Sequence, residues 1–275
     1  WAGGWRLEAT SASLPELCYT VASMELKHFT VRQDVFESPA LEGNPLGDPH
    51  RRTVPVLVPR AAERGGRFPS IYVLAGYTSG GRAFLNWHGW TPSVPERIDR
   101  LRDQGKIGDL VVVFPDGFTR YGGSQYLNSA ANGRYEDMIV EDLVRWVDST
   151  YPSIPDPARR GILGKSSGGY ASVVLGMRHP DVFSAVACHS GDMYFEYCYK
   201  ADFPKLANGL WKHGDVRAFL EQFARQPKKR HEDVAILNVL AMAACYSPDP
   251  DGPLGIGLPI DEQTGVVRDE VWSRW

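Results

Sequence analysis

The sequence predicts an α/β protein with a mostly parallel sheet flanked by helices. Residues 71–75 and 110–114 are uniformly apolar, which is typical of parallel strands buried on both faces. Segments with helical periodicity alternate with such runs. The 275 residues, 43% hydrophobic and 23% charged, suit one globular domain with a large core.

The first two strands are expected before the parallel part of the sheet. Residues 24–31 alternate between apolar and polar side chains, and residues 54–58 place valine at every second position, so both segments predict strands. Pro55 and Pro59 indicate that the second strand lies near an edge, because proline cannot donate to the ladder. A polar turn at 60–67 leads into the buried strand at 71–75.

Strands and helices then alternate. Residues 94–104 predict a helix, and residues 135–147 predict a second helix with one apolar face. Residues 161–164 predict a strand, followed by a helix of small residues that continues to Met177. Residues 183–188 predict another buried strand.

The chain changes character after Gly191, where only helices are expected. Asp215 can cap a helix over 216–223, and residues 231–245 predict a strongly apolar helix. Residues 247–259 are rich in Pro, Gly and Asp and predict a loop, and a further helix is expected from Asp269.

Three parts of the chain follow from these elements. Residues 1–23 are expected to be an upstream segment outside the core, and residues 24–192 the α/β core. Residues 193–275 are expected to be a helical cap and the start of the C-terminal part of the core. This reading treats the chain as a fragment, in which 1–23 precede a natural start at Met24 and about two further strands lie beyond Trp275.

Composition restricts the partners. A formal net charge of −3 with both signs interspersed gives no basic surface for nucleic acid. Apolar runs are too short to span a bilayer, and the first residues lack the pattern of a secretory signal. We therefore expect a cytoplasmic protein with a small-molecule substrate, and homo-oligomerisation stays open. The four cysteines are widely spaced, which predicts free thiols and no metal site: Cys18, Cys188, Cys198 and Cys245.

Ser166 is the expected nucleophile. Residues 164–168 read Gly-Lys-Ser-Ser-Gly and match G-x-S-x-G between a buried strand and a small-residue helix, the context that this motif requires. The sharp turn puts Ser166 in a strained backbone conformation, and Gly164 and Gly168 relieve the crowding. The hydroxyl is then exposed at a helix N-terminus, which favours a developing negative charge.

A phosphate-binding loop is the alternative interpretation of Lys165 and Ser166. That motif needs a glycine five positions before the Gly-Lys pair, where Arg159 stands. Gly161 leaves a loop too short to surround a phosphate, so the nucleophile interpretation is favoured.

Two backbone amides are expected to hold the oxyanion. Ser167 follows the nucleophile and supplies one, and the glycine-rich loop at 74–81 would supply the other through Tyr77. The alternative is an ordinary βα turn.

The chain resembles the esterase-D-like and enterochelin-esterase-like α/β hydrolases over about residues 24–198. The resemblance rests on the Leu-Ala-Gly-Tyr loop, Phe-Pro-Asp at 114–116, Tyr-Glu-Asp at 135–137, the elbow and His-Pro-Asp-Val-Phe at 179–183. It implies the α/β-hydrolase fold, carboxylic ester hydrolysis, a Ser, Asp/Glu, His triad and no cofactor. Ala75 and Gly76 replace the usual His-Gly, which leaves the backbone amides in place.

The acid and the histidine of such a triad are hard to place. His179 is expected at the surface or at a helix end, and His213 and His231 in solvated segments. His189 and Asp192 lie on the loop expected after the sixth strand, and Asp192 is a possible acid. The general-base histidine is therefore expected beyond Trp275.

The sequence thus predicts a serine esterase that forms an acyl-enzyme at Ser166. A thioesterase or acyltransferase of the same fold, or a non-catalytic binding protein, are the alternatives. Residues 194–259 would form a lid over the pocket, which Trp87, Trp90 and Tyr126 could line.

Overall fold

A computed structural model describes residues 25–86, 88 and 90–275, so the expected upstream segment at 1–23, Cys18 and Trp87 lie outside the described residues. The main sheet has six strands in the order β1-β2-β4-β3-β7-β8. Its strands are β1 (Phe29–Glu37), β2 (Arg51–Pro59), β3 (Ser70–Leu74), β4 (Val111–Val113), β7 (Arg160–Lys165) and β8 (Ala185–His189), and β5 (Asn128–Ser129) and β6 (Gly133–Arg134) form a separate pair. The last four strands of the main sheet run parallel, while β1 and β2 pair antiparallel. The predicted α/β-hydrolase fold with a mostly parallel sheet is confirmed.

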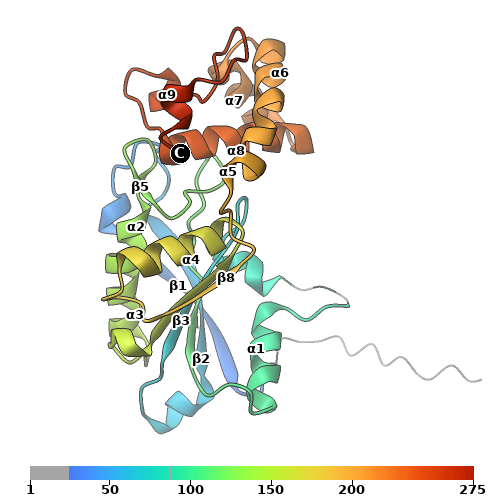
Figure 1. Cartoon of the computed structure of the whole chain (residues 1–275). Coiled ribbons are helices and arrows are strands. Elements are labelled where there is room, and N and C mark those ends of the chain that lie inside the picture. Colours follow the sequence, from blue (N-terminus) through green and yellow to red (C-terminus); the bar gives the residue numbers. More distant parts are fainter. Residues whose placement is uncertain (1–24, 87, 89) are drawn as a thin grey trace, which may run out of the picture.

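Helices cover both faces of the sheet (Figure 1). They are α1 (Val94–Asp103), α2 (Tyr135–Asp137), α3 (Val144–Thr150), α4 (Ser167–Arg178), α5 (Phe195–Cys198), α6 (Phe203–His213), α7 (Val216–Arg225), α8 (His231–Tyr246) and α9 (Asp269–Trp272). A π-helical segment, Met138–Leu143, joins α2 to α3. Short 3₁₀ turns occur at Pro39–Leu41, Arg60–Arg64, Gly81–Leu85, Pro157–Arg159, Lys200–Asp202 and Pro253–Gly255.

Alternation along the central strands divides the core into two layers. Tyr72 and Leu74 belong to the layer that contains residues of the α2–α3 segment and α4. Val73 and Val112 point to the other layer, where residues of α1 pack. Figure 1 shows α3 and α4 on one side of the sheet and α1 on the other. A strand with apolar residues at consecutive positions can bury both faces only in such an arrangement.

The helix predicted over 94–104 forms as α1. Ser93 accepts a hydrogen bond from the Glu96 amide, and the Glu96 carboxylate accepts one from the Ser93 amide at 2.6 Å. This reciprocal pair satisfies two backbone donors at the start of the helix.

The expected bounds of the first strand are wrong. The first strand covers Phe29–Glu37 and not 24–31. The strand that contains Pro55 is second from the edge, between β1 and β4, and so lies near an edge as expected. Pro55 is tolerated there because its carbonyl still accepts a hydrogen bond from the Phe114 amide at 3.0 Å, and only the donor is missing.

The last strand of the sheet is exposed, although a buried strand was expected over 183–188. It begins at Ala185, and all five of its residues are exposed. Among the described strands β8 pairs only with β7. The apolar composition predicted the strand correctly. Its burial, however, would need a second neighbouring strand, and among the described residues none pairs with the outer edge of β8.

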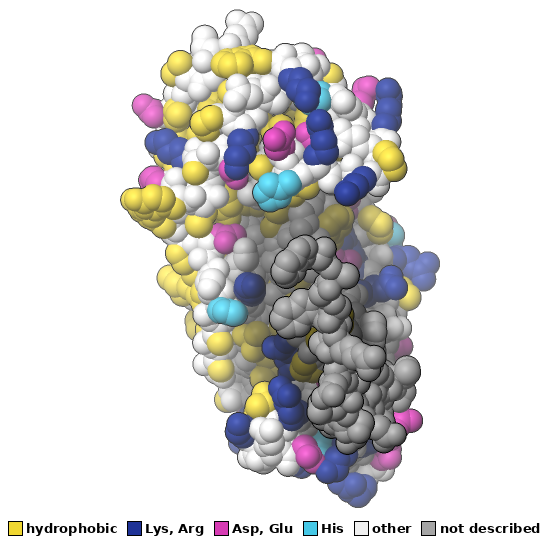
Figure 2. Space-filling view, turned by 90° about the vertical axis from the view of Figure 1, so that its right-hand side faces the viewer, with side chains coloured by type: hydrophobic (Ala, Val, Ile, Leu, Met, Phe, Trp, Pro, Cys, Tyr) yellow, Lys and Arg dark blue, Asp and Glu magenta, His cyan; other side chains and the backbone are white. Residues whose placement is uncertain are grey.

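The helices after β8 form a separate layer beyond one end of the sheet (Figure 1). They have their own core, with α8 almost completely buried between Ile236 and Cys245. The Asp215 cap accepts from the Ala218 amide at 2.8 Å, as predicted. Among the described residues after β8, β-pairing is limited to isolated bridges. Figure 2 shows acidic and basic side chains interspersed on the visible face of this helical layer, which we call the cap (residues 193–275).

Candidate active site

Ser166 stands at the turn between β7 and α4. Its backbone has φ 55° and ψ −125°, a conformation that costs a non-glycine residue strain. Its carbonyl accepts a hydrogen bond from the Tyr170 amide at 2.9 Å, which starts the helix. The side chain is therefore held at the helix N-terminus, partly accessible to solvent.

Glycines make this turn sterically possible. A Cβ at Gly164 would lie 2.3 Å from the carbonyl oxygen of Gly168, and a Cβ at Gly168 would lie 2.2 Å from the carbonyl oxygen of Leu74. Such distances are far below van der Waals contact, so the strand and the helix can meet only if both positions lack a side chain. The crowding expected from the sequence is present.

The loop after β3 lies against Ser166. A Cβ at Gly76 would be 3.4 Å from the Ser166 Cβ, so the backbone at Gly76, the residue before Tyr77, lies beside the nucleophile. The Tyr77 hydroxyl donates to the Tyr121 carbonyl at 2.8 Å, and the Thr78 amide donates to Gly122 at 2.9 Å. These contacts attach the loop to the segment after β4.

Tyr126 fixes the start of the same loop. Its hydroxyl accepts from the Ala75 amide at 3.0 Å and donates to the Ala75 carbonyl at 3.1 Å. Tyr126 is only 4% exposed, so it is an internal anchor, and it also lines a small hollow with Gly76 and Ser167. Trp90 is 93% exposed, so water surrounds most of its side chain.

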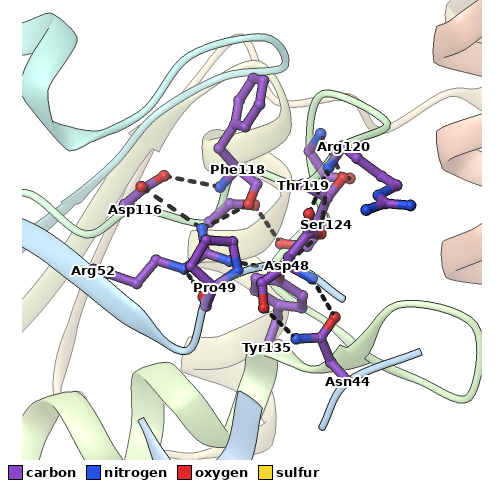
Figure 3. A network of polar contacts seen from close by, with 12 residues as sticks. Asn44, Asp48, Pro49, Arg52, Asp116, Phe118, Thr119, Arg120, Ser124 and Tyr135 are labelled. Carbon is purple, nitrogen blue, oxygen red and sulfur yellow. Dashed lines mark hydrogen bonds and ion pairs between the residues drawn. The ribbon is translucent and has the colours of Figure 1, made fainter. Parts of the chain in front are cut away.

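A second polar cluster holds the segment after β4 (Figure 3). Arg52 is almost completely buried and donates to the carbonyl of Phe118 at 2.7 Å and to the hydroxyl of Tyr135 at 2.8 Å. Asp48 accepts from the Arg120 amide at 3.1 Å. Burial raises the pKa of the Asp48 carboxyl against the lowering effect of this amide and of Arg52. The cluster therefore fixes the loop that carries Tyr126.

Asp192 reaches the nucleophile from the end of β8. Gly191 packs on the backbone of Gly169 in α4, where a Cβ at Gly191 would lie 2.9 Å from the Gly169 carbonyl carbon. This close approach brings the Asp192 carboxylate to the elbow. It accepts from the Ser166 hydroxyl at 3.1 Å and from the Ser167 hydroxyl at 3.0 Å.

The hydrogen-bond network extends from Asp192 into the cap. Tyr199 donates to Asp192 at 3.0 Å, and Gln125 donates to Tyr199 at 2.7 Å and to Tyr246 at 3.0 Å. Burial, and then the Asp192 charge, raise the pKa of the Tyr199 hydroxyl, so it is a neutral donor. Sequence reasoning missed Gln125 and Tyr199, because no local motif marks either of them.

All seven histidines of the chain lie among the described residues, and none has its ring hydrogen-bonded to Ser166. His189 is the last residue of β8 and not a loop residue, and it contributes only its carbonyl, which accepts from the Ser166 amide at 3.2 Å. His179 pairs with Glu136 at 2.8 Å, and His213 packs on the ring of Phe219.

Other kinds of site find no support in the described residues. No group of three or more His, Cys, Asp or Glu side chains there could hold a metal ion. The helices of residues 25–275 include none with the length and apolar character needed to cross a bilayer.

Comparisons with known proteins place these features in context. The model of the family described as "Putative esterase" matches residues 48–243. YbbA of Bacillus subtilis (strain 168), an uncharacterised protein, is 22% identical over 165 residues, which are 54% of this chain and 59% of YbbA. The chain thus spans less than two thirds of the length of this curated relative.

Two of the similar solved structures illustrate their likeness to this chain. A ferulic acid esterase is 24% identical with a TM-score of 0.48, over 60% of this chain and 58% of that one. The fluorophosphonate-binding serine hydrolase F of Staphylococcus aureus is 17% identical with a TM-score of 0.49, over 77% of this chain and 73% of that one.

Proposed function

Because the chain belongs to this esterase family, we propose that it is a serine hydrolase that cleaves carboxylic esters of small molecules through an acyl-enzyme at Ser166. The observation that supports this most directly is the elbow itself. Ser166 has a positive φ at a strand-to-helix turn, and the glycine loop after β3 lies against its Cβ. This is the arrangement that acyl transfer needs, because it exposes a hydroxyl beside backbone amides.

The proposed reaction has two steps. The Ser166 oxygen attacks the ester carbonyl carbon and gives its proton to a general base, while the amides of Tyr77 and Ser167 stabilise the oxyanion. Collapse of this intermediate breaks the ester bond, and the departing alcohol takes the proton. Water then attacks the acyl-enzyme in the same way and releases a carboxylic acid and free Ser166.

We further propose that the general base is a histidine outside this chain, since none of the seven histidines in it contacts the Ser166 hydroxyl. The exposed edge of β8 supports this view. A parallel strand with five exposed residues is unusual in a sheet of this type, and further strands that pair with it would end next to Asp192. In this proposal the described chain supplies the carboxylate of the site, Asp192, and the histidine comes from outside it.

The cap is proposed to form the wall of the substrate pocket, as residues 193–275 lie beyond the end of the sheet where Ser166 stands (Figure 1). Met193, Tyr194 and Tyr197 expose large apolar surfaces where the cap begins. Such side chains suit an acyl or alcohol group with apolar character.

Labelling with a fluorophosphonate probe tests the nucleophile. We expect a form of the protein that includes the general base to be labelled, and Ser166→Ala to lose the label. Ser172→Ala is the matched control, because it removes a hydroxyl from the same helix that bonds only to the carbonyls of Gly169 and Ala187. Label that persists in Ser166→Ala contradicts the assignment.

The same probe tests the position of the base. The 275-residue chain alone should be labelled much more slowly than a longer product of the gene. Equal labelling of the two would show that the base lies within this chain and would make Asp192 the leading candidate. A longer product that is not labelled would favour a non-catalytic binding protein.

A further inference from the structure

Asp192 receives hydrogen bonds from two layers of the molecule. Ser166 and Ser167 donate to it from the start of α4, and Tyr199 donates to it from the cap. In each contact the hydroxyl is the donor and a carboxylate oxygen of Asp192 the acceptor, and a hydroxyl has only one proton to donate. Within this arrangement the Ser166 hydroxyl has a defined direction.

Gln125 fixes the direction of the Tyr199 hydroxyl. Since the Tyr199 proton points to Asp192, the Tyr199 oxygen can only accept from Gln125, which requires the nitrogen of the amide on that side. The second hydrogen of this nitrogen goes to Tyr246 at 3.0 Å. The chain of donors therefore runs in one direction, from Gln125 through Tyr199 to Asp192.

Gln125 occupies its position at a cost. It has φ 52°, and the next residue, Tyr126, has φ 54°. The oxygen of its side-chain amide is buried and has no hydrogen-bond partner among the described residues. Strain and an unpaired buried acceptor persist only where other contacts determine the conformation, and they gather at functional sites.

Backbone strain of this kind is concentrated around the nucleophile. Of the six non-glycine residues with positive φ in the described chain, five lie in the loops that meet at Ser166. They are Thr78, Gln125, Tyr126, Ser166 and Ser190, and Leu254 is the sixth.

We propose that Tyr199 is a positioning residue for the nucleophile and acts through Asp192, with Gln125 holding its hydroxyl in the required direction. The inference rests on the proposed function, and it extends the role of the cap. The cap would then do more than enclose the substrate, because it orients the group that directs the Ser166 hydroxyl.

Tyr199→Phe is the first variant. It keeps the ring, which packs against Phe195 with a centroid distance of 5.0 Å, and removes only the hydroxyl. We expect the rate of fluorophosphonate labelling of Ser166, in the form of the protein that labels fastest, to fall about tenfold, the scale of one hydrogen bond to a charged group. Tyr151→Phe is the control, because its hydroxyl also donates to a carboxylate, that of Asp34 at 2.6 Å, but lies outside the candidate site.

A double-mutant cycle with Asp192→Ala decides whether Tyr199 acts through Asp192. In the Asp192→Ala background, Tyr199→Phe should no longer change the labelling rate. A tenfold loss that persists there would show that Tyr199 only supports the cap, and a Tyr199→Phe rate equal to that of the parent would also overturn the proposal.

Urea unfolding of the same four proteins separates this inference from the proposed function. Coupling between the two substitutions in the free energy of unfolding reports the contact whether or not Ser166 reacts. If the parent protein is not labelled at all, the hydrolase assignment fails, and the positioning role fails with it. If the parent is labelled but neither cycle shows coupling, only the positioning role fails.

Discussion

The adjacent strands β7 and β8 lead to the two parts of the candidate site, but one strand is buried and the other is exposed. They pair in parallel over five residues, and β7 leads to Ser166 while β8 leads to Asp192. Ile162 of β7 is 1% exposed, whereas Val186, its partner across the pair, is 45% exposed. Residues 161–164 of β7 and 185–188 of β8 are all apolar, so the difference comes from neighbours. β7 has a strand on each side, and β8 has one on only one side among the described residues.

We expect the largest effect from a substitution at Gly168, where α4 packs against the central strands. Alanine there would place a Cβ 2.2 Å from the Leu74 carbonyl oxygen, so strand and helix must separate. We expect a loss of roughly 4 kcal/mol in the free energy of unfolding, or no folded protein. Urea denaturation measures it. Gly108→Ala is the control, since no atom lies within 4 Å of a Cβ there; equal stability of the two variants would contradict the packing.

The paired residues Ile162 and Val186 sharpen the comparison directly. Ile162→Ala should cost about 3 kcal/mol, because it leaves a cavity in the core. Val186→Ala should cost about 0.5 kcal/mol, because water already reaches this side chain. Denaturation of the 275-residue chain tests both values. A similar cost at the two positions would mean that the edge of β8 is covered in solution.

The sequence was sufficient where the determining contacts are local. The elbow at Ser166 and the Asp215 cap each depend on residues within about four positions of one another, and spacing reveals such patterns. The parallel sheet also followed, because continuous apolar runs indicate burial on both faces.

Contacts between distant segments could not be predicted. The exposure of β8 depends on which strand stands beside it, and its apolar composition gives no information on that neighbour. Similarly, the network of Asp192, Tyr199 and Gln125 joins three segments through side-chain hydrogen bonds. A lone Gln or Tyr has no distinctive spacing, and Asp192 could be proposed only because it follows a strand next to the elbow.

Tyr126→Phe is a milder substitution, and it tests how the loop after β3 is held beside Ser166. Phenylalanine would leave the Ala75 amide and carbonyl without the hydroxyl that satisfies both. We expect a cost of about 1.5 kcal/mol in unfolding and slower fluorophosphonate labelling, because Ala75 begins the loop beside Ser166. Tyr121→Phe in the same segment is the control, since its hydroxyl has no hydrogen-bond partner among the described residues. An unchanged stability in Tyr126→Phe would show that the loop is held in another way.

The smallest expected effect concerns the exposed edge strand β8, whose accessibility can be measured with a chemical probe that leaves the fold intact. Cys188 lies on β8 and is exposed, while Cys245 is buried in the cap. Burial raises the pKa of the Cys245 thiol to about 12, so it stays protonated at pH 8 and should not react with iodoacetamide, whereas Cys188 should react readily. Mass spectrometry of digested Cys18→Ser protein measures both sites, with exposed Cys198 as the internal reference.

The same probe applied to a longer product of the gene distinguishes two states of the edge. Strands that pair with β8 would shield Cys188 and lower its reactivity relative to Cys198, as the proposed position of the general base requires. If Cys188 reacts equally in both proteins, the edge of β8 stays open, and the base must reach Ser166 from elsewhere in the molecule.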